Sequence, residues 1–175
     1  IVVRSLLKAR PDAAKAIVDD GSERMPVMHR LLTQGATANA VTCQLLLKAD
    51  PDSASRPQKS GRRLNPMQIA MQASCNAEII ELLLGLDRDA AGTREKGNQG
   101  PLPIFLSWVG ATSRKKLVPS PLESIKILLS ACPAVCLPVA GSSALHCALE
   151  GWAPVEHIRW LLEVEPAAVR RATKR

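Results

Sequence analysis

Residues 6–14 read LLKARPDAA, and this pattern returns four times along the chain. The later copies are LLKADPDSA at 46–54, LLGLDRDAA at 83–91, LLSACPAVC at 128–136 and LLEVEPAAV at 161–169. Measured between the second leucines, the steps are 40, 37, 45 and 33 residues. Repeats of this length indicate helical units that stack in one direction and bury a continuous core between neighbours.

The residues around each leucine pair predict an amphipathic helix. Apolar side chains occupy the position four residues before the second leucine: Val3, Cys43, Ile80, Ile125 and Ile158. A polar side chain follows each of them, and this spacing places the apolar residues on one helix face. We expect five such helices, each ending near the proline or arginine four residues after the second leucine, because proline halts a helix. Leu46, Leu83 and Leu128 should be buried between units.

A second apolar segment precedes each later copy, so each unit should contain two helices. Asn65 can cap one of these segments with Pro66 in its first turn, and Asn76 can cap the helix that follows. The segments lie at 25–32, 65–72, 102–109 and 143–150. The chain then divides into a partial unit at 1–14 and full units at about 15–54, 55–91, 92–136 and 137–175.

The start of the first helix in each unit resembles the ankyrin-repeat motif T-P-L-H-x-A. Residues 143–148 read SALHCA, and residues 66–70 read PMQIA. The chain as a whole, with LLxxxPxAA after the second helix, is similar to divergent ankyrin arrays. The resemblance implies an all-α fold, an ankyrin-like solenoid of stacked helix-turn-helix repeats with about four full repeats and one leading helix. Because other two-helix repeats have periods in the low forties, a HEAT-like solenoid stays open.

The resemblance also implies a function, since ankyrin arrays bind other proteins on the concave face. We therefore expect a non-enzymatic protein–protein interaction scaffold with an unidentified protein partner. The residues expected to bind it stand just before the first helix of each unit or at its exposed end. By position these are Glu23, Arg24, Thr33, Arg62, Arg63, Gln72, Gln99 and Glu150.

Charge and aromatic content bear on an alternative partner. The formal charge is +7, of which residues 57–120 carry +4, with basic clusters at Arg62 and Arg63 and at 114–116. One Phe, three Trp and no Tyr offer few surfaces on which bases could stack, which disfavours specific nucleic-acid recognition. A weak electrostatic contact of the basic loops with nucleic acid or a membrane surface remains the alternative.

The chain shows no motif for a catalytic site, a cofactor, a metal or a small-molecule substrate. Cys132, Cys136, His146 and Cys147 have the spacing C-x3-C-x9-H-C, which matches no common zinc pattern. His29 has no nucleophile or acid in a useful sequence context, and His157 is expected at the surface or in packing between units. We expect neither catalytic residues nor metal ligands nor a bound cofactor.

The cysteines and the hydropathy pattern predict the compartment. Five cysteines form an odd set without the density of a disulfide-rich secreted domain. No apolar run approaches the roughly 20 residues of a membrane-spanning helix. We expect an intracellular, cytoplasmic protein, with the nucleus as the alternative.

The chain begins with Ile1 inside a helical pattern. We therefore expect an excerpt of a longer array with apolar surface at both ends. A second alternative for function follows, namely a regulatory repeat segment of a larger multidomain protein or enzyme.

Overall fold

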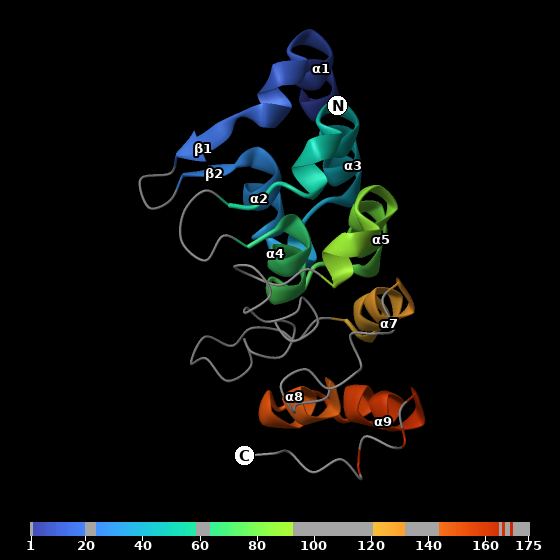
Figure 1. The fold of residues 1–175 in the computed structure, drawn as a ribbon. Helices are drawn as coiled ribbons and strands as arrows, with labels where there is room; N and C mark the ends of the chain where they lie inside the picture. The colour runs from blue at the N-terminus through green and yellow to red at the C-terminus, as the bar shows by residue number, and fades with distance from the viewer. Residues whose placement is uncertain are drawn as a thin grey trace.

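The computed structural model describes residues 2–19, 24–58, 64–92, 121–131 and 144–164, together with Pro166 and Val169. This part of the chain is mostly helical, and its helices follow one another down the molecule in chain order (Figure 1). A single two-stranded sheet accompanies the helices in these ranges. Within them, no helix has both the length and the apolar character needed to cross a bilayer.

Five helices, here called the outer helices, occupy the positions predicted from the leucine pairs. They are α1 (Val2–Ala9), α3 (Ala40–Ala49), α5 (Ala77–Leu86), α7 (Leu122–Ala131) and α9 (Val155–Val164). Each one ends two residues after the second leucine of its pair. The predicted helices and their ends are therefore confirmed.

Three outer helices end with the same backbone geometry. Arg10, Asp50 and Asp87 follow α1, α3 and α5 with φ between −143° and −139° and ψ between 81° and 86°. Each donates its N–H to the carbonyl oxygen of the first leucine of the pair, at 2.8, 2.8 and 2.9 Å. A short 3₁₀ helix comes next: η1 (Pro11–Lys15), η3 (Pro51–Ala54) or η4 (Arg88–Ala91).

Proline explains this geometry at two of the three positions, because the residue before a proline is driven out of the helical region. Asp87 precedes Arg88 instead, and its carboxylate accepts a hydrogen bond from the N–H of Ala90 at 3.1 Å. A side-chain cap thus reproduces at Asp87 the junction that proline produces elsewhere.

Three inner helices lie where the second apolar segments predicted them. They are α2 (Val27–Leu32), α4 (Pro66–Gln72) and α8 (Ala144–Glu150), whereas the segment 102–109 lies outside the described residues. The side chain of Asn65 accepts from the N–H of Gln68 at 2.8 Å, and that of Gln68 accepts from the N–H of Asn65 at 2.9 Å. Pro66 opens α4, and Asn76 caps α5 by accepting from Ile79 at 3.1 Å. The predicted caps are confirmed.

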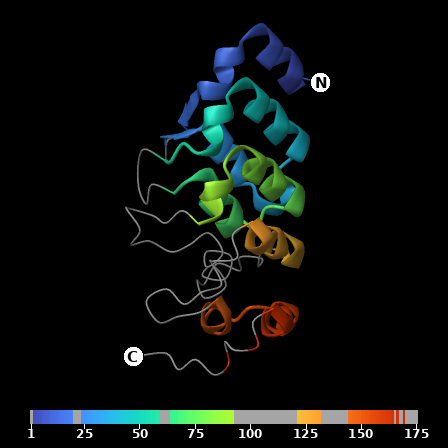
Figure 2. The same ribbon diagram turned by 45° about the vertical axis from the view of Figure 1, so that its right-hand side comes forward.

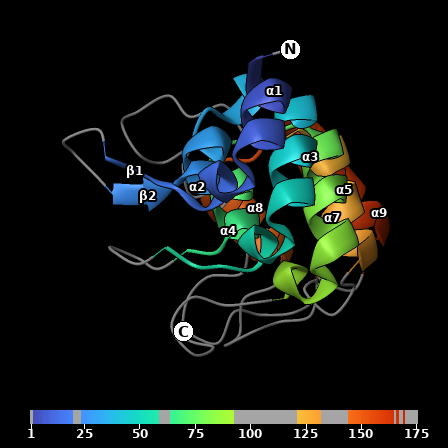
Figure 3. The same ribbon diagram turned by 90° about the horizontal axis from the view of Figure 1, so that it is seen from above.

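The helices pack in two rows. In the outer row α1 packs on α3, α3 on α5 and α5 on α7, while in the inner row α2 packs on α4 (Figures 2 and 3). Leu46, Leu83 and Leu128 of α3, α5 and α7 are 4%, 1% and 0% exposed, which confirms their predicted burial. Leu6 is 55% exposed, since α1 has an outer neighbour on one side only among the described helices.

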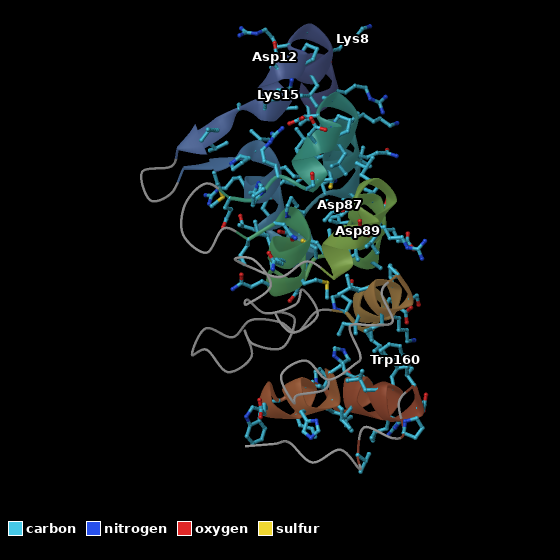
Figure 4. All side chains as sticks on the ribbon, viewed as in Figure 1. Lys8, Asp12, Lys15, Asp87, Asp89 and Trp160 are labelled. Atoms are coloured by element: carbon cyan, nitrogen blue, oxygen red, sulfur yellow. The ribbon has the colours of Figure 1, made fainter. Side chains whose placement is uncertain are left out.

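The last outer helix also contributes to the core. Leu161 of α9 is 2% exposed. Trp160 lies on the side of α9 that faces α7 and packs against the core (Figure 4). Exposed apolar side chains on the same helix include Leu162 and Val164, at 37% and 52%.

A short hairpin between η1 and α2 was not predicted from the sequence. β1 (Ile17–Asp19) pairs antiparallel with β2 (Arg24–Pro26), with Val18 opposite Met25. The N–H of Val27 donates to the carbonyl oxygen of Ala16 at 3.1 Å and ties the hairpin to the start of α2. Strands of three residues are too short for an alternating pattern to be read from the sequence.

We predict that Leu83→Ala lowers the free energy of unfolding by about 2–5 kcal/mol, because it leaves a cavity between outer helices. Leu86→Ala is the control in the same helix, since Leu86 is 51% exposed and should change stability far less. Urea denaturation of both variants measures this difference. Equal losses in the two variants would contradict the assignment of Leu83 to the core.

Two glycines should respond in opposite directions to the same substitution. Gly35 has φ of 61°, and a Cβ there would overlap the carbonyl oxygen of Ala73, so Gly35→Ala should destabilise the chain by more than about 1 kcal/mol. Gly85 lies within α5, and a Cβ there meets no atom within 4 Å. Gly85→Ala should raise the stability by up to about 1 kcal/mol. Thermal denaturation checks the signs, and two shifts in the same direction would refute the prediction.

Candidate functional site

Three of the predicted partner-binding residues stand at the same end of successive inner helices. Thr33 follows the last residue of α2, Gln72 ends α4 and Glu150 ends α8. Thr33 and Glu150 are exposed and Gln72 is half-buried. The Thr33 hydroxyl donates to the carbonyl oxygen of Arg30 at 2.8 Å, which ties its side chain to the end of α2. Since α2 packs on α4, the structure brings the ends that carry Thr33 and Gln72 into neighbouring positions.

The other predicted binding residues are described in part or not at all. Arg24 lies in β2, where the structure describes its backbone. Glu23, Arg62, Arg63 and Gln99 lie outside the described residues. Their place in a partner-binding face stays a prediction.

The connection that contains Arg62 and Arg63 is held at both of its flanks. Arg56 makes two contacts with the Asp50 carboxylate, at 2.8 Å from Nη1 and 3.3 Å from Nη2. The Asp50 side chain is 3% exposed, and the Arg56 guanidinium offsets the cost of burying its negative charge. Farther along, the N–H of Gln58 donates to the carbonyl oxygen of Leu64 at 2.9 Å.

The buried thiols act as packing groups. Cys43 and Cys75 are free and buried, and burial raises their pKa values to about 11 and about 12. The Sγ atom of Cys43 lies 3.9 Å from the Sδ atom of Met28, and the Cys75 thiol donates to the carbonyl oxygen of Leu32 at 3.4 Å. Both thiols keep their protons near neutral pH, whereas a nucleophile or a metal ligand requires the thiolate.

The structure bears on the predicted absence of a metal site only for the residues that it describes. The described residues contain no group of three or more His, Cys, Asp or Glu side chains placed to hold a metal ion. Cys132 and Cys136 lie outside these residues, and the structure does not describe the side chain of Cys147.

His29 is a buried histidine in α2, with 0% of its surface exposed. Burial lowers its pKa from 6.5 to about 4, an effect that the charge of Arg56 reinforces and the carbonyl groups of Arg56 and Leu64 oppose. Neither ring nitrogen makes a hydrogen bond of normal length and angle with the described residues. The neutral imidazole therefore serves as a packed side chain beneath the connection that leads to α4.

His157 is also buried, at 3% exposure, which places it in the packing of α9 instead of at the surface. Burial lowers its pKa, and the charge of Glu156 opposes this effect. Of the two placements that the sequence left open, the structure therefore selects internal packing.

A groove between α3 and α5, here called the outer groove, has a volume of about 560 Å³. Its apolar lining comes from Leu47, Pro51, Leu82 and Leu86, and exposed Lys48, Glu78 and Glu81 also line it. A smaller groove of about 260 Å³ lies between α5 and α7. The sequence pattern pointed to the inner helices and predicted neither groove. Gly85, which lines both of them, was the one available signal, because an isolated glycine in an apolar helix pattern often has a packing or functional reason.

Comparisons of the chain with family models, with curated proteins and with solved structures found no match.

The burial of His29 predicts a pH-dependent stability. Between pH 6.5 and about 4 the unfolded chain binds a proton at this imidazole and the folded chain does not. The contribution of the neutral His29 to the free energy of unfolding should therefore be fully present above pH 6.5. As the pH drops through this range, the free energy of unfolding should fall by up to about 3 kcal/mol. His29→Leu should remove this part of the dependence, as measured by urea denaturation at several pH values. Parallel stability curves for the wild type and the variant would contradict the assignment.

Proposed function

We propose that the chain is a non-enzymatic scaffold, an ankyrin-like solenoid that binds a partner protein on the face formed by the inner helices and the connections before them. The observation that carries this proposal is the recurring junction after α1, α3 and α5. A backbone that leaves three helices with the same φ, ψ and hydrogen bond is expected of repeated units.

The two rows of helices explain why such a repeat favours binding over catalysis. Each unit contributes its apolar side chains to the shared core and its inner-helix end to a common face. Equivalent positions such as Thr33 and Gln72 then form a row of polar side chains on a rigid support. A partner can contact several units at once, and the side chain at each position sets specificity.

The state of the buried titratable groups agrees with this proposal. Cys43 and Cys75 keep their protons, and His29 stays neutral in the core. These groups support the packing of the core.

Affinity capture from the native cell, with variants of the proposed face, tests the function. We expect the double variant Thr33→Arg/Gln72→Arg to capture at least about tenfold less of a partner that the wild type captures, because two bulky charges would enter the interface. Ser130→Arg is the control, since Ser130 is exposed in the last turn of α7, where a basic residue is favourable.

Equal melting curves for the three proteins would show that folding is intact. Capture of the same partner by the wild type and the double variant alike would place the binding elsewhere and refute the proposed face.

A further inference from the structure

The outer groove and the smaller groove beside it are joined at α5. Glu81 and Gly85 line both of them, so the two hollows meet along one helix. Leu47 is buried at 3% exposure and Leu82 is half-buried, whereas Leu86 presents 51% of its surface. An apolar surface thus continues from the core to the solvent on the side of the molecule formed by the outer helices.

Gly85 leaves this hollow open, although the backbone conformation at position 85 does not require a glycine. It lies inside α5 with a helical conformation, and a Cβ at this position would meet no atom within 4 Å. A glycine weakens a helix relative to alanine, and neither a turn nor a close approach explains it here. Its effect on the structure is to leave the groove open where a side chain would otherwise project.

The charges along the outer groove are separated by sign. Glu78 and Glu81 lie in the first half of α5, whereas Lys48 lies in the last turn of α3. Because α3 and α5 run in the same direction (Figure 3), one end of the groove is acidic and the other is basic. The ion pairs seen among the described residues involve none of Glu78, Glu81 and Lys48.

We propose that the outer groove binds an amphipathic helix of a partner protein, running antiparallel to α3 and α5. Its aliphatic side chains enter between Leu47 and Leu82 over Gly85. Lysine or arginine in its last turn faces Glu78 and Glu81, and aspartate or glutamate in its first turn faces Lys48.

Three physical arguments select this occupant. The apolar lining between two parallel ridges fits the stripe that an amphipathic helix presents at every third or fourth residue. The separated charges match a helix with acidic residues in the first turn and basic residues in the last, which is also the order that its own dipole favours. The antiparallel direction brings the positive end of its dipole to the negative ends of α3 and α5.

The length of the groove sets the size of the probe. α3 and α5 contain 10 residues each, so a helix lying along them has about 15 Å of contact, or about three turns. Two synthetic peptides of about 14 residues suffice, with one aliphatic stripe and the same composition. One carries glutamates in the first turn and lysines in the last, and the other carries the reverse.

Fluorescence anisotropy with these labelled peptides tests the proposal. The wild type should bind the peptide with glutamates first about tenfold more tightly than the reversed peptide. The triple variant Glu78→Lys/Glu81→Lys/Lys48→Glu should prefer the reversed peptide. Because the helicity of each free peptide is the same in both measurements, a reversed preference in the triple variant must come from the charges of the groove.

Gly85→Leu supplies the matched test of the hollow. A leucine should fill the groove and reduce binding of the preferred peptide at least about tenfold, while the melting temperature stays equal to or above that of the wild type. Thr33→Arg/Gln72→Arg should bind the peptide as the wild type does. The outer groove and the proposed face of the inner helices are therefore tested independently.

Three outcomes would overturn the proposal. They are no binding of either peptide up to about 1 mM, equal binding by Gly85→Leu, or an unchanged peptide preference in the triple variant.

Discussion

Burial of the first leucine in the pairs of α3, α5, α7 and α9 is the interaction on which the rest of the structure depends. Leu46 and Leu83 are closed off between neighbouring outer helices, and Leu128 of α7 is fully buried in the same core cluster. A helix of 10 residues cannot bury its own apolar face, and isolated helices of this length are marginal in water. Each of these helices is therefore stabilised by its neighbours, and the core continues along the chain as one cluster from α1 to α9.

The recurring junction converts this packing into a regular spacing of surfaces. The N–H groups of Arg10, Asp50 and Asp87 donate to the carbonyl oxygens of the first leucines of the pairs, so the chain leaves these three helices in the same way. Proline produces this exit after α1 and α3, and an aspartate cap produces it after α5. The inner helices α2 and α4 pack on each other, and Gly35 after α2 lies against Ala73 after α4, so the ends of the two helices are neighbours.

The two sides of this stack offer different chemistry. The ends of the inner helices carry the polar side chains of Thr33, Gln72 and Glu150, which are exposed or half-buried. The outer groove instead exposes apolar side chains that belong to the interface between α3 and α5. A helical ligand in this groove would add to that interface in the manner of a third helix, which is why its recognition combines aliphatic contacts with the charges at the two ends.

Much of the local structure could be predicted from the sequence, because helix propensity, apolar spacing and capping act over a few residues. The outer helices, their ends and the caps at Asn65 and Asn76 are of this kind. The hairpin at β1 and β2, the buried imidazole of His29 and the hollow at Gly85 are not. Each of them depends on which segments meet across the stack, and a side chain's neighbours in space are not encoded by its neighbours in the chain.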